Sequence, residues 1–437
     1  MRILSVTAGA AGMYCGSCLR DNALATELMA RGHDVTLLPL YTPTNPDEPN
    51  VSRNRVLFGG ISIYLQQHLA LFRKTPRLLD RLWDSPAVIG ALAARSISTD
   101  PKLLGDLTIS MLEGEDGVLR KEFNKLRAWL ADEPPPDVVN LPNSLLISLA
   151  RPLAEALNCP ITCTLQGEEL FLDGLVEPYR TKALTLIRRQ VRDVDRFIAV
   201  SEWYAPFMAR LLGVGPERMS VVPLGINMQG YERAQDDGVF RVGYFARIAP
   251  EKGLLGLAQA YVRFRQRTGN ARIRLEAAGY LSAAHKPYLD EVTNVLQAAG
   301  LGGEFTYHGA IDRTGKIRFL RTLSVLSVPT PYDEPKGVFL LEAMAVGVPV
   351  VQPRRGSFTE VVENTGGGIL VAPDDPSALA DGLNALWKDP DRRRALAALA
   401  FDGVREHYSV QRSADAQLNV FQALTTRVPQ PGLVLTK

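Results

Sequence analysis

Two glutamates separated by seven residues give the sequence its clearest chemical signal. Glu334 and Glu342 lie on either side of Gly337, and the second glutamate falls within a mostly apolar run from 338 to 345, which predicts a short, buried helix. Gly347 is typical of a helix end, and the β-branched residues after it favour a strand. We therefore expect the first glutamate in the loop before the helix and the second within the helix.

The loop before this helix has the properties of a phosphate site. A helix N-terminus offers free backbone N–H groups and the positive end of the helix dipole, which together attract anions. Gly337 would let an anion come close, whereas Glu334 and Glu342 are better matched to the hydroxyls of a sugar or ribose. The pattern is compatible with a nucleotide-sugar site. An ordinary amphipathic helix with two solvated acids is the alternative.

A second cluster of candidate residues follows the apolar run that starts at Phe240. This predicted strand delivers Arg247, and five residues later Lys252, to the start of a helix that begins after Gly253. Two cations and free N–H groups at one place are the arrangement needed to hold a diphosphate leaving group. A solvated Arg and Lys on a loop is the alternative interpretation.

These motifs together resemble a known family. Glu-x7-Glu followed by Ala-Met-Ala-x-Gly-x-Pro is similar to the signature of the retaining glycosyltransferases of family 4. The Gly-x-x-x-Arg and Glu-Lys-Gly elements around Arg247 and Lys252 match the spacing of that family's donor site. The resemblance covers most of the chain, with a gap from about 42 to 136.

The resemblance implies an α/β protein with the GT-B fold, in which two Rossmann-like, doubly wound domains face each other across a cleft. We expect an acceptor-binding domain over 1–226, with a helical insertion at about 42–136, and a donor-binding domain over 227–406. The polar run from 228 to 238 is the expected linker and hinge. A helix within 407–437 is expected to pack back on the first domain.

The resemblance also implies roles for individual residues. Arg247 and Lys252 would stabilise the departing diphosphate, Glu334 would bind sugar hydroxyls and Glu342 the donor ribose. The other implied donor-binding residues are Gly16, Gly337, Val338, Phe339 and Ile311.

Two positions depart from the family pattern. Cys15 stands where the family has the first glycine of a pair with Gly16, and Gln166 stands where a histidine is common. We therefore assign no catalytic histidine, and expect Gln166 or Glu168 to hold the transferred sugar or the acceptor.

The implied reaction moves a sugar from a nucleoside diphosphate sugar to an acceptor hydroxyl with retention of anomeric configuration. It needs no cofactor and no metal, because two cationic side chains and a helix N-terminus would supply the charge, and the sequence has no Asp-x-Asp motif. A nucleotide-sugar epimerase of the same fold and a catalytically silent nucleotide-sugar-binding protein remain alternatives. The sequence identifies neither the nucleobase, the sugar nor the acceptor.

Length and composition agree with a two-domain globular protein. The chain has 437 residues, of which 46% are hydrophobic and 22% charged. Its 49 basic and 47 acidic residues leave a net charge of +2, which gives no reason to expect nucleic acid as a partner. No run is long and apolar enough for a membrane span, and we expect a cytoplasmic protein. Peripheral membrane association and oligomeric state stay open.

Cys15-Gly-Ser-Cys18 is the most unusual local feature. A Cys-x-x-Cys pair at a helix N-terminus can have a lowered thiol pKa and redox activity. The surrounding strand–loop–helix unit differs from that of thioredoxin, so close packing of a tight loop is the favoured interpretation. Cys159 and Cys163 have no His-x3-His nearby, and a zinc site is not expected.

The insertion is the expected acceptor platform, because the resemblance places the acceptor in the first domain. Its residues of the types that contact sugars, or that simply pack, are Tyr64, Gln66, Gln67, His68 and Trp83.

Overall fold

The computed structural model describes residues 1–9, 16–53, 56, 58, 104–233, 237–269 and 272–426. The chain divides into two compact units. The first contains residues 1–200, 205–222 and those from 413 onward, and the second contains residues 201–204 and 223–412.

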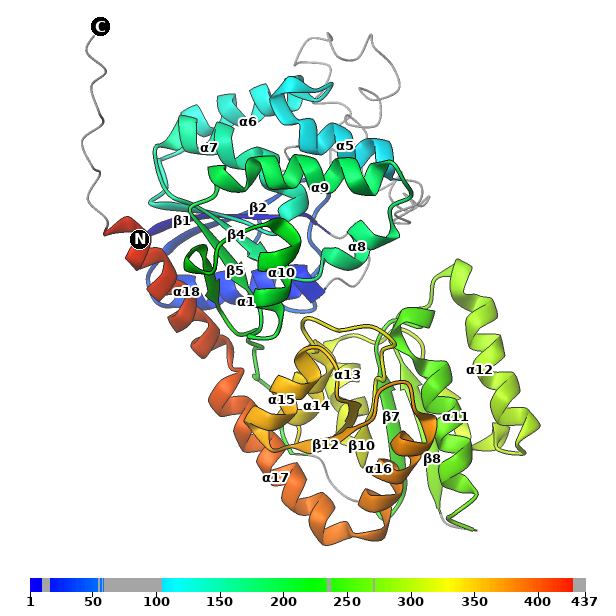
Figure 1. The fold of residues 1–437 in the computed structure, drawn as a ribbon. Coiled ribbons are helices and arrows are strands. Elements are labelled where there is room, and N and C mark those ends of the chain that lie inside the picture. The colour runs from blue at the N-terminus through cyan, green and yellow to red at the C-terminus, as the bar shows by residue number, and fades with distance from the viewer. Residues whose placement is uncertain are drawn as a thin grey trace, which may run out of the picture. The chain divides into compact units, whose positions relative to one another are not determined.

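A six-stranded parallel sheet forms the centre of the described part of the first unit, in the order β2-β1-β3-β4-β5-β6 (Figure 1). Its strands are β1 (Arg2–Thr7), β2 (Asp34–Pro39), β3 (Val138–Leu141), β4 (Ile161–Leu165), β5 (Arg196–Ala199) and β6 (Met219–Val221). Central strands β3 and β4 are buried along their whole length, as expected for a parallel sheet covered on both faces.

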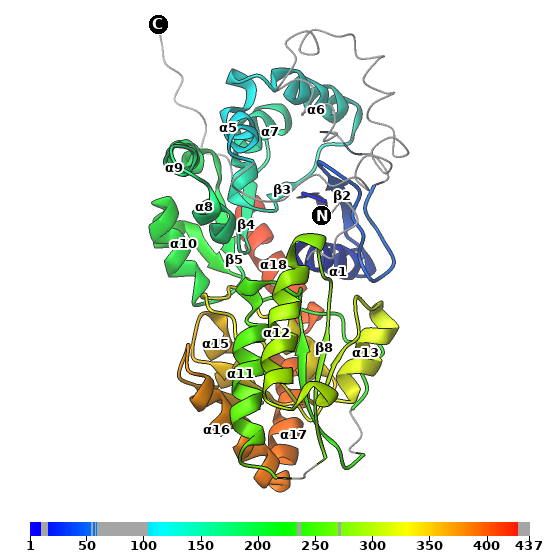
Figure 2. The ribbon, with the colours of Figure 1, turned by 90° about the vertical axis from the view of Figure 1, so that its right-hand side faces the viewer.

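Helices cover both faces of this sheet. Helices α1 and α18 lie together on one side, and α5, α6 and α7 lie beyond the other (Figure 2). The helices of this unit are α1 (Gly16–Ala30), α5 (Gly105–Glu113), α6 (Arg120–Asp132), α7 (Ala150–Leu157), α8 (Glu169–Gly174), α9 (Tyr179–Gln190), α10 (Tyr204–Leu212) and α18 (Val410–Thr425).

The last helix belongs mostly to the first unit. Ala414, Leu418 and Phe421 recur at helical spacing on α18 and pack in one core with Ile3 and Leu28. Helix α18 therefore packs in the core of the first unit.

The second unit is built on another six-stranded parallel sheet, in the order β12-β11-β10-β7-β8-β9 among the described residues. Its strands are β7 (Phe240–Phe245), β8 (Ile273–Ala278), β9 (Phe305–Tyr307), β10 (Val325–Leu326), β11 (Val350–Pro353) and β12 (Gly368–Val371). Its helices are α11 (Leu254–Arg265), α12 (Lys286–Ala298), α13 (Arg313–Arg321), α14 (Val338–Ala345), α15 (Ser357–Thr365), α16 (Pro376–Lys388) and α17 (Pro390–His407). Helix α11 packs on α12 and α16, and α17 packs on α14 and α15.

Three segments named in the sequence analysis are the start of α1, the segment from 228 to 238 and the insertion. Helix α1 starts at Gly16, so Cys18 lies in its first turn. The segment expected to be a polar linker is anchored instead, because Tyr231 is buried in the core of the second unit. The five insertion residues named above and Cys15 lie outside the described residues.

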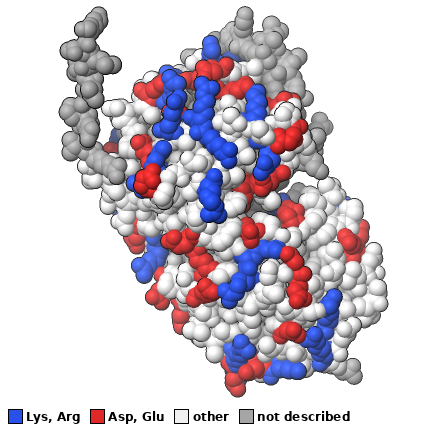
Figure 3. Space-filling view, viewed as in Figure 1, with Lys and Arg blue, Asp and Glu red and all other residues white. Residues whose placement is uncertain are grey.

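Charged side chains of both signs are interspersed on the face shown in Figure 3. None of the helices in the described part of the chain is long and apolar enough to cross a membrane. In the same part, no three His, Cys, Asp or Glu side chains are grouped so that they could hold a metal ion. Among the described cysteines, Cys159 and Cys163 are free thiols.

Candidate active site

The two signature glutamates lie where the sequence predicts them. Helix α14 has the predicted bounds, Glu334 lies in the loop before it, and Glu342 lies within it. Gly347 follows the helix with a φ of +74°, a left-handed conformation that favours glycine, and β11 comes next. The helix is buried on nearly every side, because seven of its eight residues are buried.

The N-terminus of α14 is open at its cap. Gly337 is the cap residue, with a φ of +63°, and no side chain caps the helix. Gly356 and Ser357 pack against the loop before this helix. The backbone N–H of Ser357 donates to the Glu334 carbonyl at 2.8 Å. A Cβ on Gly356 would lie 2.6 Å from that carbonyl oxygen, so only glycine permits this approach. The loop therefore presents backbone N–H groups at a fixed position.

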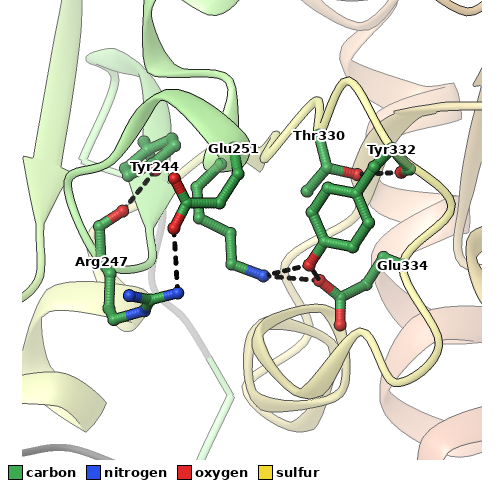
Figure 4. A network of polar contacts seen from close by, with 7 residues as sticks. Tyr244, Arg247, Glu251, Thr330, Tyr332 and Glu334 are labelled. Carbon is green, nitrogen blue, oxygen red and sulfur yellow. Dashed lines mark hydrogen bonds and ion pairs between the residues drawn. The ribbon is translucent and has the colours of Figure 1, made fainter. Parts of the chain in front are cut away.

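Lys252 and Glu334 form a buried ion pair beside this helix end (Figure 4). Lys252 Nζ donates to Glu334 Oε2 and to the Tyr332 hydroxyl, both at 2.6 Å. The Tyr332 hydroxyl also donates to Glu334 Oε2, and Lys252 Nζ lies 5.8 Å from the centroid of the Phe339 ring. The Lys252 side chain is 14% exposed and that of Glu334 is 5% exposed. The ammonium is thus held in place before any ligand arrives.

The electrostatics of this pair favour an ionised carboxylate. Burial alone would raise the pKa of Glu334, but the charge and hydrogen bond of Lys252 outweigh it. The hydrogen bond from Tyr332 and the charge of Lys336 act in the same direction, and the pKa of Glu334 falls to about 2. Glu334 is therefore a hydrogen-bond acceptor at neutral pH and not a proton donor.

Arg247 reaches the same edge of the sheet from the neighbouring strand. It follows β7, which pairs in parallel with β10, so the residues after both strands meet at their carboxyl ends. Its Nη2 donates to Glu251 at 3.0 Å, and its side chain is 45% exposed. Tyr244 donates to the Arg247 carbonyl at 2.8 Å and fixes the backbone there (Figure 4). The guanidinium remains accessible to a ligand.

Gly253 places Lys252 at the start of α11. Its φ is +77°, and a Cβ there would lie 2.0 Å from the Pro329 carbonyl oxygen. Glycine is therefore required both by conformation and by the close approach of the chain after β10.

Glu342 has a partner that sequence patterns did not predict. Lys316 Nζ, on α13, donates to Glu342 Oε1 at 2.6 Å, and both side chains are almost completely buried. The Tyr231 hydroxyl lies at 3.5 Å from the same oxygen. In the sequence, Lys316 is one lysine in an amphipathic helix, and such lysines are too common to predict a buried ion pair.

Ile311 lies in the loop between β9 and α13 and packs partly against the core. Asp312 caps α13 by accepting from the Gly315 N–H at 2.7 Å, which fixes the residue after Ile311. His308 before it pairs with Glu276, with 2.6 Å between Nε2 and Oε2. Ile311 and the α14 residues Val338 and Phe339 thus belong to the same unit as the ion pair.

The first unit holds the remaining candidates. Glu168 accepts through Oε1 from the N–H and the hydroxyl of Ser144, each at 3.0 Å, and through Oε2 from the Gln166 N–H at 2.8 Å. Gln166 donates from Nε2 to the Pro142 carbonyl at 2.9 Å. Glu168 therefore ties the ends of β3 and β4 together. Gly16, the first residue of α1, lies at the carboxyl edge of the same sheet.

Two family models match the chain, one described as "Glycosyl transferases group 1" over residues 232–401 and one described as "Glycosyl transferase 4-like domain" over residues 21–225. The chain belongs to the family 4 glycosyltransferases. Among the relatives of this glycosyltransferase is the glycogen synthase of Mycobacterium tuberculosis (strain ATCC 25618 / H37Rv), which is 25% identical over 330 residues, or 74% of this chain and 76% of the relative. Another is the phosphatidyl-myo-inositol mannosyltransferase of Mycobacterium leprae (strain TN). It is 27% identical over 312 residues, which are 69% of this chain and 77% of the relative.

Solved structures support the GT-B fold of this glycosyltransferase. Sucrose-phosphate synthase from Thermosynechococcus elongatus has a TM-score of 0.70 and 17% identity, over 97% of this chain and 99% of that one. HepE of Anabaena, in complex with UDP and glucose, has a TM-score of 0.65 and 16% identity, over 97% of this chain and 100% of that one.

Proposed function

We propose that this glycosyltransferase moves a hexosyl group from a nucleoside diphosphate sugar to an acceptor hydroxyl, with retention of anomeric configuration and without a metal ion. The observation that carries the proposal is the position of Lys252, held by Glu334 and Tyr332 beside the uncapped N-terminus of α14. A fixed ammonium next to free backbone N–H groups suits a diphosphate.

The diphosphate contacts follow from the donors available. The Lys252 ammonium has three N–H donors, and two of them are directed to Tyr332 and Glu334. The third, with the half-exposed guanidinium of Arg247, can bind phosphate oxygens. As the bond between the sugar and the phosphate breaks, negative charge grows on the leaving group, and these cations stabilise it without reorganisation.

The two glutamates bind opposite ends of the sugar nucleotide in this proposal. Glu342 accepts hydrogen bonds from the ribose hydroxyls, while Lys316 donates to its Oε1 and holds the carboxylate in place. Glu334 accepts hydrogen bonds from the transferred sugar, because its low pKa keeps it ionised. Gly337 and Ile311 contribute backbone groups to the donor.

In this proposal, retention needs no enzymic nucleophile. The acceptor oxygen approaches the anomeric carbon from the side that the diphosphate leaves. The bond from that carbon to the phosphate oxygen breaks, the bond to the acceptor oxygen forms, and the hydroxyl proton passes to the departing phosphate. Two related proteins are named glycogen synthase and phosphatidyl-myo-inositol mannosyltransferase, and both names describe hexosyl transfer.

Incubation of the protein with UDP-, GDP- and ADP-sugars and a panel of sugar and polyol acceptors tests the proposal. UDP-glucose is the first donor to test, because HepE of Anabaena was solved in complex with it. We expect release of the nucleoside diphosphate together with a glycosylated acceptor. Conversion of the donor to an isomer would indicate an epimerase, and binding without turnover a silent binding protein. Either result would contradict the proposal.

Lys252→Met should lose transfer activity, whereas Lys286→Met should keep it. Lys286 is an exposed lysine at the start of α12 and serves as the matched control for loss of one positive charge.

A further inference from the structure

A buried arginine in the first unit is not explained by the donor site. Arg20 lies on α1, and its side chain is only 2% exposed. Its Nη1 donates to Asp21 Oδ1 at 3.2 Å, but Nε and Nη2 have no hydrogen-bond partner among the described residues. Burial lowers the pKa of this guanidinium more than the charge of Asp21 raises it. A buried cation with two unused donors is costly unless a ligand binds it.

Helical geometry places Arg20 toward the functional edge of the sheet. Arg20, Leu24 and Leu28 are spaced by four residues and share one face of α1. Leu24 and Leu28 belong to the core with Ile3 of β1, so Arg20 continues that face one turn nearer the helix N-terminus. Because α1 follows β1, its N-terminus lies at the carboxyl end of the sheet, where open α/β folds bind ligands.

Two further buried polar atoms at this edge also lack partners among the described residues. They are Gln166 Oε1, directly after β4, and Asn143 Oδ1, two residues after β3. Strands β1, β3 and β4 are neighbours in the sheet, so the segments that follow β3 and β4 start within two strand spacings, or roughly 10 Å, of the end of the strand that precedes α1. The edge therefore offers one cation with two unused N–H groups and two neutral oxygens that can accept hydrogen bonds from hydroxyls. The buried carboxylates of Asp21 and Glu168 also lie here, and they accept hydrogen bonds from Arg20 and from Ser144 and Gln166, respectively.

We infer that this edge binds the acceptor, and that the acceptor is a polyol carrying an oxyanion, either a phosphate or a carboxylate. The Nε and Nη2 of Arg20 match two oxygens of such a group side by side. Gln166 Oε1 and Asn143 Oδ1 accept from its hydroxyls. This inference rests on the proposed function and specifies its acceptor. The donor phosphates have their own cations in Arg247 and Lys252, so Arg20 is assigned to the acceptor.

Calorimetry on the full chain in phosphate-free buffer tests the inference. The probes are myo-inositol 1-phosphate, glucose 6-phosphate and glucuronate, with myo-inositol, glucose and inorganic phosphate for comparison. We expect at least one anionic polyol to bind roughly 10- to 150-fold more tightly than its neutral parent, the range for hydrogen bonds to a charged group. The phosphate and carboxylate probes show which oxyanion is preferred.

Variants assign that preference to Arg20. Arg20→Met should abolish the preference for the anionic probe, while Arg189→Met, at an exposed position on α9, should keep it. In Arg20→Met, Asp21 loses its partner, and the protein can be destabilised for that reason alone. The double variant Arg20→Met/Asp21→Asn removes this charge as well and serves as the second test. Its unfolding temperature without ligand should equal or exceed that of the wild type, because an unsatisfied buried charge is removed.

Three results would overturn the inference. One is equal affinity for anionic and neutral polyols, another is an Arg20→Met variant that folds and keeps the preference, and the third concerns nucleotide affinity. The affinity of the same samples for UDP and GDP is measured in separate titrations, to distinguish failure of the inference from failure of the proposed function. Failure of nucleotide binding in the wild type counts against the proposed function, whereas loss of nucleotide affinity in Arg20→Met alone would assign Arg20 to the donor and overturn the inference.

Discussion

Replacing Lys252 by methionine should change how the stability of the protein depends on pH. In the wild type the pKa of Glu334 falls from 4.5 to about 2, which corresponds to about 3 kcal/mol at roughly 1.4 kcal/mol for each pH unit. Because the folded-state pKa is the lower one, this stability is present above about pH 4.5 and is lost as the pH falls toward 2. Both side chains are buried, so solvent screens the pair weakly.

The variant should behave in the opposite way. Without Lys252, burial dominates and raises the pKa of Glu334 above its ordinary value. Stability is then lost as the pH rises through that raised pKa. The difference between wild type and Lys252→Met should therefore be largest near pH 7, at about 3 kcal/mol or more, and should shrink toward pH 3.

Urea unfolding of the wild type and of Lys252→Met at several pH values between 3 and 7 measures this difference. The double variant Lys252→Met/Glu334→Gln should reduce the difference at pH 7, because no buried carboxylate is left unpaired. Lys286→Met should show a small difference that does not depend on pH. A Lys252→Met difference equal at pH 3.5 and pH 7 would refute the electrostatic account of the pair.

Three further predictions concern the reaction. Arg247→Ala should lower kcat by roughly 100-fold while the donor KM changes little, and steady-state kinetics with saturating donor that show wild-type turnover would contradict its role. Glu342→Gln should weaken binding of the free nucleoside diphosphate and raise the donor KM, since it loses charge-assisted bonds of about 1.5 to 3 kcal/mol, whereas Glu334→Gln should leave that affinity nearly unchanged and lower transfer. Calorimetry that finds equal losses in the two variants would mean that the donor is oriented differently. EDTA should leave the rate unchanged, and a loss restored by Mg²⁺ or Mn²⁺ would show that the cationic side chains are not sufficient.

The parts of the site that depend on local patterns could be predicted from sequence. The bounds of α14 followed from a mostly apolar run between two glycines, and the start of β7 from the apolar run that begins at Phe240. Local chemistry decides these elements, because helix ends and strand ends are set by the residues within a few positions.

Contacts between distant segments could not be predicted. The contact between Lys316 and Glu342 joins residues that are 26 positions apart in the sequence. The hydrogen bond from Tyr332 to Glu334 depends on the conformation of the loop before α14, which the residue pattern does not determine. The segment containing Tyr231 is polar overall, and composition therefore indicated a linker although one aromatic side chain anchors it in the core. Arg20 was missed for the same reason, since its burial depends on the packing of α1 against the sheet.

The anomeric configuration of the product tests the central claim most directly. The wild-type protein would be supplied with an α-linked nucleoside diphosphate hexose, starting with UDP-α-glucose, and the configuration of the new glycosidic bond would be determined by proton NMR. The account predicts an α-linked product with the release of free nucleoside diphosphate. A β-linked product would contradict it, because inversion requires attack from the side opposite the diphosphate and a separate base to take the acceptor proton.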